Sequence, residues 1–165
     1  MLHAVFFILL IMRMDINKFN LRDDHEGVYK FVLDAAIKLK NAGADCLVLC
    51  ANTLHQHVER LDEEIKLPII HIADATAVEI KKQGISTIGL LGTKFTMEMD
   101  FYTKKLSNAG ITSIVPEIEE RLFIHSTIMT ELLREIFKSE SKKKFLDIIN
   151  DLKVKGAQEI VLGCT

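Results

Sequence analysis

Apolar and polar positions follow two different periods along the chain. Short runs of consecutive apolar residues alternate with longer segments in which apolar residues recur every three or four positions. Continuous short runs are typical of strands buried on both faces of a parallel sheet, whereas the 3.6-residue period indicates amphipathic helices. The apolar runs predict strands at 5–11, 47–49, 69–72, 87–91, 111–115 and 159–162.

Helix starts are marked by capping patterns. Asp23 with Glu26 three residues later precedes the first helical segment, and Thr53 with Gln56 repeats this spacing before the second. In such a capping box each side chain satisfies a backbone N–H at the start of the helix. The first of these helices is expected to end at Gly43 and the second before Pro68, and further helices are predicted at 74–84, 96–109, 119–137 and 139–155.

The regular alternation of strands and helices predicts an α/β protein built from parallel βαβ units. The apolar segment 1–12 fits this scheme as its first strand. It carries no basic residue ahead of the apolar run and no small-residue cleavage site after it, so a secretion signal is disfavoured. It is also shorter than the ~20 residues that a membrane-spanning helix needs.

One pattern recurs three times. A helix ends in Gly, an apolar strand follows, and a turn of small residues containing Thr comes next, at 43–53, 84–93 and 156–165. Such turns lie at the carboxyl ends of parallel strands, where α/β proteins bind ligands. Gly and Thr also serve simply as turn and cap formers, but three like turns favour a binding site. Eight residues after the Gly of each copy stand Ala51, Gly92 and Cys164.

Composition narrows the class of protein. Apolar residues make up 48% of the 165 residues, and 21 basic residues against 23 acidic ones give a net charge of −2. A nucleic-acid-binding protein would show a basic surplus, so that class is disfavoured. Three cysteines are an odd number, which argues against a disulfide scaffold and for a reducing cytoplasm. The cysteines and histidines lack zinc-ligand spacing, and the glycines form no dinucleotide or phosphate loop, which predicts chemistry without a cofactor.

Cys164 is the residue best placed for chemistry. A thiolate in a turn at a strand end is a competent base or nucleophile, although a lone cysteine is more often a buried, inert one. Cys50 precedes Ala51 in the matching turn and should point to the opposite face from it. Cys46 is expected to belong to the core.

Several separated motifs together resemble the aspartate/glutamate racemase family. They are VLCANTLH at 48–55, LPIIHIADAT at 67–76, IGLLGTKFTM at 88–97 and LGCT at 162–165. The resemblance implies two pseudosymmetric α/β lobes, with parallel sheets flanked by helices and the site between the lobes. It also implies racemisation of acidic amino acids without pyridoxal phosphate, in which one residue of each lobe, usually a cysteine, moves the Cα proton.

The resemblance assigns roles position by position. Cys164 matches the second catalytic position, whereas Ala51, which cannot move a proton, stands at the first. His55 is either a support for the substrate-holding residues or an exposed histidine of a first helical turn. Lys94 and Arg134 are candidates for the distal carboxylate, and surface solvation is the alternative for both. The residues expected to bind substrate are Asn52, Thr53, Thr93, Thr96 and Thr165, and no metal site is expected.

The predicted lobes span residues 1–83 and 84–165. Both are expected to be incomplete, because the family's glycine-rich N-terminal strand and loop and its closing strand and helix have no counterpart. The expected function is a cofactor-independent racemase of aspartate or glutamate, impaired at the first base. The alternatives are a one-thiol decarboxylase or isomerase, or a truncated remnant that only binds acidic amino acids. The expected partner is a small acidic amino acid in the cytoplasm, with no nucleic acid and no membrane, and a homodimer is allowed.

Overall fold

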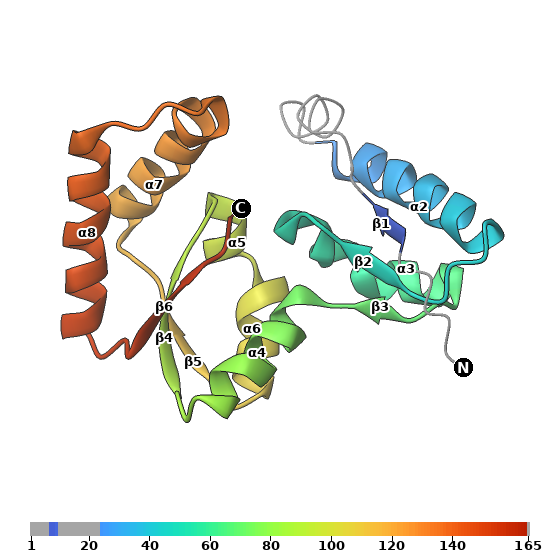
Figure 1. The fold of residues 1–165 in the computed structure, drawn as a ribbon, viewed down its shortest axis with the longest axis horizontal. Coiled ribbons are helices and arrows are strands. Elements are labelled where there is room, and N and C mark those ends of the chain that lie inside the picture. Colours follow the sequence, from blue (N-terminus) through green and yellow to red (C-terminus); the bar gives the residue numbers. More distant parts are fainter. Residues whose placement is uncertain (1–6, 10–23, 165) are drawn as a thin grey trace. The chain divides into compact units, whose positions relative to one another are not determined.

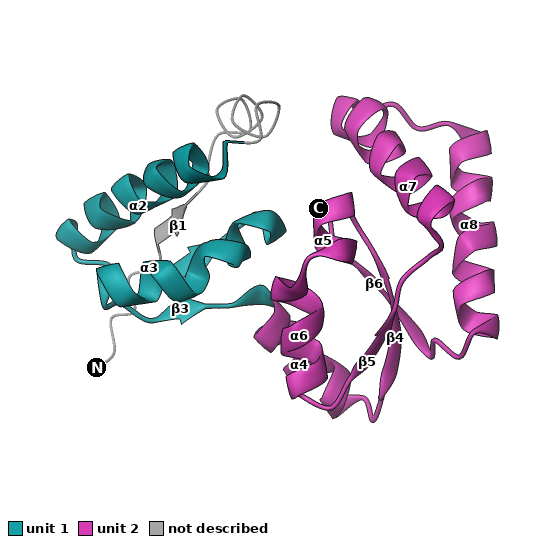
Figure 2. Ribbon diagram, turned by 180° about the vertical axis from the view of Figure 1, so that it is seen from behind, with its two compact units in different colours: residues 1–72 teal, residues 73–165 magenta. Residues whose placement is uncertain are grey.

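The computed structural model describes residues 7–9 and 24–164. It forms two compact units, residues 1–72 and 73–165 (Figure 2). The sequence predicted this boundary after residue 83, which would put the helix predicted at 74–84 in the first unit. In the structure this helix belongs to the second unit. Its buried residues Ala73 and Ile80 pack with Ile88 and Leu90 of the following strand, which is why it groups with the second unit.

The first unit is a parallel sheet covered by helices (Figure 1). Its strand order is β1-β2-β3, and Phe7 pairs with Leu47 while Leu47 pairs with Ile69. The predicted first strand is thus confirmed at its centre, and the remainder of the predicted range 5–11 lies outside the described residues. The elements are β1 (Phe7–Leu9), α2 (His25–Asn41), β2 (Leu47–Leu49), the 3-10 helix η1 (Asn52–His57), α3 (Val58–Ile65) and β3 (Ile69–Ile70).

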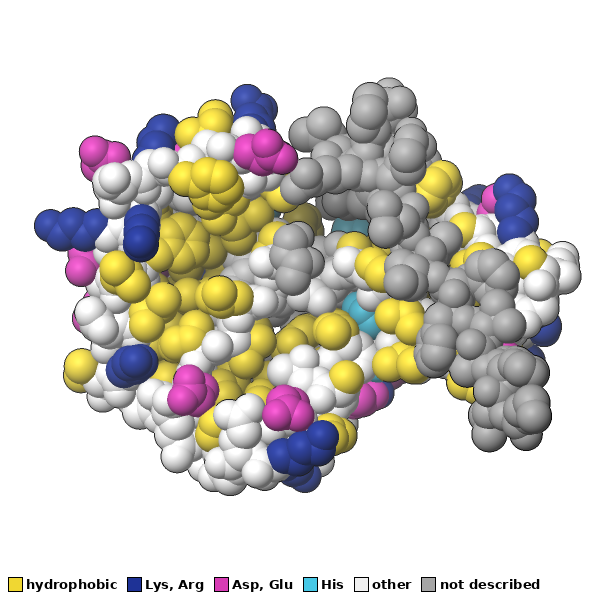
Figure 3. All heavy atoms as spheres, in the orientation of Figure 1, with side chains coloured by type: hydrophobic (Ala, Val, Ile, Leu, Met, Phe, Trp, Pro, Cys, Tyr) yellow, Lys and Arg dark blue, Asp and Glu magenta, His cyan; other side chains and the backbone are white. Residues whose placement is uncertain are grey.

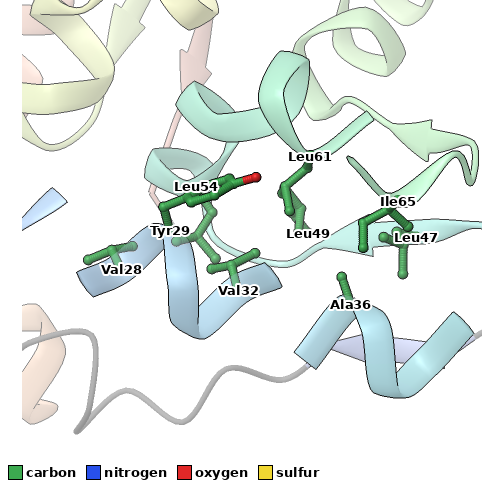
Figure 4. Packing of buried hydrophobic residues seen from close by; sticks show 9 residues of the cluster. All are labelled: Val28, Tyr29, Val32, Ala36, Leu47, Leu49, Leu54, Leu61 and Ile65. Carbon is green, nitrogen blue, oxygen red and sulfur yellow. The ribbon is translucent and has the colours of Figure 1, made fainter. Parts of the chain in front are cut away.

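Helix α2 supplies much of the core of the first unit. Val28, Val32 and Ala36 recur at the helical period and pack with buried residues of β2 and α3 (Figure 4). The helix is capped by Asp24, whose carboxylate accepts a hydrogen bond from the Gly27 N–H at 2.8 Å. The cap is therefore one residue later than predicted, and Asp23 lies outside the described residues.

The second predicted helix start is wrong. Thr53 does not cap a helix but lies inside η1, a tight 3-10 segment that opens with the Leu54 N–H bonded to the Ala51 carbonyl at 3.1 Å. The regular helix α3 begins only at Val58. The tighter winding turns His55 back toward the end of β2, where its side chain is bonded, and this tertiary contact overrides the local cap pattern.

The second unit is a helix–sheet–helix sandwich. Its parallel sheet has the order β5-β4-β6, with α4 and α6 on one face and α7 and α8 on the other (Figure 1). Its elements are α4 (Ile72–Lys82), β4 (Thr87–Leu91), α5 (Lys94–Glu98), α6 (Asp100–Asn108), β5 (Thr112–Ile114), α7 (Ile118–Thr130), the 3-10 helix η2 (Leu132–Arg134), α8 (Ser139–Val154) and β6 (Glu159–Leu162).

Two predicted helices of this unit are each divided. The segment predicted at 96–109 is α5 followed by α6, separated at Met99, whose backbone is extended at φ −89° and ψ 146°. The segment predicted at 119–137 ends as α7 at Thr130, and η2 then closes at Glu135, which has a φ of 61°. Helix α5 also starts earlier than the predicted residue 96, because Thr93 is its cap.

Exposed apolar side chains gather on the α7–α8 side of the second unit (Figure 3). Phe137 is 79% exposed, and Leu122 and Leu146 are each 50% exposed. A cavity of about 310 Å³ opens between η2 and the start of α8, lined by Leu132, Phe145 and neighbouring residues.

Candidate active site

The carboxyl end of the second sheet brings two of the repeated turns together. Strands β4 and β6 are hydrogen-bonded neighbours in parallel register, with Leu91 opposite Leu162. The turn after β4 therefore lies beside the end of β6, and the Gly163 N–H donates to the Leu91 carbonyl. This pairing places the segment 92–96 against the segment that carries Cys164.

A chain of hydrogen bonds links these two segments. The Thr93 oxygen accepts from the Thr96 N–H at 3.5 Å, and the two threonine hydroxyl oxygens are 3.2 Å apart. The Thr96 hydroxyl also donates a long bond, 3.5 Å, to the Gly163 carbonyl. Two of the predicted substrate-binding threonines are thus joined to each other and to the backbone before the thiol.

Both turns rely on glycine for close approach. A Cβ atom on Gly163 would lie 2.9 Å from the Thr96 methyl carbon, and one on Gly92 would lie 3.0 Å from the Thr96 Cβ. Such distances are below van der Waals contact, so any side chain here would displace Thr96. Gly92 and Gly163 therefore leave room for the Thr96 side chain between the two turns.

Cys164 is partly buried, and it packs against the cluster that contains Leu91, Met97 and Ile124. Within the part of the chain that the structure describes, no disulfide joins Cys164, Cys46 or Cys50. Thr165, also predicted to bind substrate, lies outside the described residues.

Thr96 differs from its predicted role. Its side chain is only 1% exposed and its hydroxyl is bonded within the protein. Thr93, by contrast, is partly exposed at the start of α5. A substrate can therefore reach the Thr93 side chain more readily than that of Thr96.

His125 on α7 is part of this end of the unit and was missed by the sequence reasoning. Its Nδ1 atom accepts a hydrogen bond from the Lys94 backbone N–H at 3.4 Å, and its ring meets that of Phe95 edge-on at 6.3 Å. A lone histidine within a helix carries no sequence signal for this contact, which joins residues 31 positions apart.

The charges around His125 are mixed. Glu98 forms ion pairs with Lys94 at 3.9 Å and with Arg121 at 3.3 Å. Burial lowers the pKa of His125 below its ordinary value of 6.5, the positive charge of Lys94 lowers it further, and Glu98 acts in the opposite direction. At neutral pH this histidine is therefore uncharged, which its role as a hydrogen-bond acceptor requires.

The matching turn of the first unit follows β2. Cys50 is exposed, whereas Ala51 is partly buried and packs against the core of this unit, as the opposite orientation predicted for these two residues requires. Asn52 and Thr53 follow at the start of η1, and both are partly buried. The position at which a first catalytic residue was expected is thus occupied by a methyl group that contacts apolar residues.

His55 holds this turn in place. It is 2% exposed, and its Nε2 atom lies 3.1 Å from the Leu49 carbonyl, so this nitrogen carries the proton and donates. Its ring also lies 4.4 Å from that of His71, which is buried just after β3. The interpretation of His55 as an exposed first-turn histidine is wrong, because its ring is buried between the ends of two neighbouring strands.

The other predicted cations have different surroundings. Lys94 directly follows Thr93 and is half exposed. Arg134 is an exposed residue of η2, which packs against α7. Within residues 7–9 and 24–164, no group of three or more His, Cys, Asp or Glu side chains is arranged to hold a metal ion. No helix in this same part of the chain is both long and apolar enough to cross a membrane.

Comparison with known proteins shows the family to which the chain belongs. Residues 18–165 match the family model described as Asp/Glu/Hydantoin racemase. The chain is 32% identical over 87 residues to the broad specificity amino-acid racemase RacX of Bacillus subtilis, covering 53% of this chain and 38% of that protein. It is 32% identical over 149 residues to the glutamate racemase of Aquifex pyrophilus, covering 85% of this chain and 53% of that protein.

Among solved structures, a candidate Asp/Glu racemase from Yersinia pestis superposes with a TM-score of 0.86 and 38% identity. The match covers 94% of this chain and 68% of that one. The chain spans about half, or less, of the length of the two curated relatives.

The surroundings of His125 predict a pH dependence. Below pH 6.5 the unfolded chain binds a proton at this histidine more readily than the folded chain, so the stability of the second unit should fall as the pH drops below that value. His125→Gln should weaken this dependence, and exposed His25→Gln should not. Thermal melts between about pH 5 and 8 measure it. In an NMR titration, Lys94→Gln should raise the pKa of His125, and an unchanged or lower pKa would contradict the assigned contact.

Proposed function

The chain belongs to the Asp/Glu/hydantoin racemase family, and from this premise we propose that it moves the Cα proton of an acidic amino acid with the thiol of Cys164. The observation that carries the proposal is the arrangement in the second unit. There the end of β6 brings Cys164 beside the turn 92–96 that follows β4.

Cys164 acts as the base on one face of the substrate. Its thiolate takes the Cα proton, so the C–H bond breaks and an S–H bond forms. The electron pair of the broken bond stays on the substrate, delocalised from Cα into the α-carboxylate. Return of a proton from the same thiol regenerates the same enantiomer, and delivery from the opposite face would invert it. Oriented hydrogen-bond donors stabilise the charge that develops on the carboxylate.

Neutral polar groups suit this task. By the family resemblance, Asn52, Thr53 and Thr165 are proposed to bind the α-carboxylate and the amino group. The Thr93 hydroxyl oxygen is proposed to accept a hydrogen bond from the amino group. The binding role of Thr93 is supported by the partial exposure of this residue and by its fixed place at the cap of α5. Lys94, next along the chain, is proposed to meet the distal carboxylate, because a partly exposed ammonium can exchange its partner Glu98 for a substrate carboxylate.

Ala51 limits the stereochemical outcome. By the family resemblance this position supplies the proton on the second face, and here it is a methyl group packed on the core. We therefore expect Cα proton exchange to exceed racemisation. A reaction on one face of Cα only, such as decarboxylation followed by protonation by Cys164, is therefore a second candidate function.

A working thiol also restricts where the protein acts. The described cysteines form no disulfide, and a catalytic Cys164 must stay reduced. We therefore propose a reducing compartment, the cytoplasm, as its place of action.

Isotope exchange tests the role of Cys164 directly. In heavy water, L- and D-aspartate and L- and D-glutamate are incubated with the protein, and deuterium at Cα is measured by mass spectrometry. Wash-in should occur for one enantiomer, and Cys164→Ser should slow it by about 10² or more, because a positioned base contributes on that order. Cys50→Ser is the matched control, since it removes an exposed thiol from the other unit.

Two results would count against this assignment. Wash-in that survives Cys164→Ser would show that another group is the base. A chain that binds an acidic amino acid in calorimetry but exchanges no Cα proton in any variant would be a binding protein instead.

Restoring a proton-moving group at residue 51 should restore inversion. Ala51→Cys and Ala51→Thr should raise the racemisation of aspartate or glutamate by about 10²–10⁴, the usual contribution of a general acid or base. Ala51→Val is the control, because valine matches threonine in size but lacks the hydroxyl. Polarimetry or chiral chromatography measures the product. Equal rates for Ala51→Thr and Ala51→Val would contradict the expectation, and an efficient parent protein would mean that another residue already supplies the second base.

A further inference from the structure

We propose that Thr96 is a positioning residue, whose buried hydroxyl fixes the Gly163–Cys164 peptide and thereby the place of the thiol. The inference rests on the proposed function only in that this function gives the Cys164 thiol a reaction to perform. It concerns a hydrogen-bonded contact inside the second unit that joins residues 67 positions apart.

Thr96 is buried between the two glycines. The Thr96 side chain is 1% exposed and fills the space between Gly92 and Gly163. A buried hydroxyl must find hydrogen-bond partners, because leaving it unpaired would cost free energy. Its partners are the Thr93 hydroxyl at 3.2 Å and the Gly163 carbonyl at 3.5 Å.

Each threonine hydroxyl has one proton to donate, which fixes the direction of these hydrogen bonds. A carbonyl oxygen can only accept, so the single hydroxyl proton of Thr96 is donated to Gly163. The Thr93 hydroxyl must in turn donate to the Thr96 oxygen, while the Thr93 oxygen accepts from the Thr96 N–H. The bonds therefore run from the partly exposed Thr93 through Thr96 to the backbone before the thiol.

The planarity of the peptide bond carries this constraint to Cys164. Gly163 is held at both of its backbone groups, with its N–H donated to Leu91 and its carbonyl accepting from Thr96. The Gly163 carbonyl and the Cys164 N–H lie in one trans plane and point in opposite directions. A carbonyl directed at Thr96 therefore fixes the direction of the Cys164 N–H and the Cα from which the thiol extends.

The threonine methyl group also lies against both glycines, so an effect of losing the methyl must be separated from an effect of losing the hydroxyl. The methyl carbon occupies the place that a Gly163 side chain would need. The experiment must therefore vary the hydroxyl without varying the size of the side chain. Thr96→Ser and Thr96→Ala form one such pair, because both lose the methyl group and only serine keeps a hydroxyl. Thr96 itself and Thr96→Val form the second pair.

Alkylation of Cys164 by iodoacetamide is the probe, and it needs no substrate. The rate at Cys164 is followed by peptide mass spectrometry across a range of about pH 6 to 9.5, which spans ordinary thiol ionisation. Cys46 in the first unit is the reference within each sample, and melting temperatures report on folding. Thr127→Val is the matched control, because Thr127 is a buried threonine elsewhere in the same unit.

We expect the rate of Cys164 alkylation to depend on whether residue 96 has a hydroxyl group. Iodoacetamide should alkylate Cys164 about three to ten times faster in Thr96→Ala than in Thr96→Ser, because one hydrogen bond is worth about that factor. The same increase, with a displaced pH profile, is expected in Thr96→Val relative to the parent protein. Thr96→Ser should stay within about twofold of the parent and Thr127→Val should match it. Cα exchange should move in the opposite direction, since a freed thiol is more accessible but less well aligned.

Equal Cys164 alkylation in the serine and alanine variants, at equal melting temperatures, would overturn the inference. The serine–alanine pair decides the question even where the valine variant does not fold. If the parent protein shows no Cα exchange but the alkylation contrast is present, the positioning role stands and the proposed function fails.

Discussion

The parallel pairing of β4 with β6 is the constraint on which the candidate site depends. With Leu91 opposite Leu162, the residues that follow the two strands must emerge side by side at one edge of the sheet. Gly92 and Gly163 then allow the approach to be close enough for Thr96 to fill the space between them. A shift of this register by one residue would turn the side chains of β6 to the opposite face and move Cys164 away from the turn.

The first unit uses a different device at the corresponding place. There the 3-10 winding of η1 returns His55 to the Leu49 carbonyl, and His71 packs against it from the end of the neighbouring strand. Both turns are thus held by a buried polar side chain bonded to a backbone carbonyl at a strand end. They differ in chemistry, because one leads to the thiol of Cys164 and the other to the methyl group of Ala51.

Much of this fold could be predicted from the sequence, because strands and helices follow from the period of apolar positions. The strands at 47–49, 87–91 and 159–162 agree with the structure, and so does the long helix α8. What failed depended on distant contacts. The 3-10 winding at Thr53 accompanies the hydrogen bond of His55 to Leu49, and α4 packs against β4; no local sequence pattern signals either contact. The break at Met99 was not predicted either. The same applies to the site, where Thr93 and Cys164 carried motifs, but the contacts of Thr96 with Gly163 and of His125 with Lys94 did not.

An acidic amino acid is proposed to bind where the β4–α5 turn meets the end of β6. NMR titration of the ¹⁵N-labelled protein with L- and D-aspartate and glutamate measures this most directly. The amide signals of Gly92, Thr93, Gly163 and Cys164 should shift together, with one common dissociation constant. Shifts confined to the cavity beside Phe137 and Phe145, or none at this end of the sheet at saturating amino acid, would contradict it.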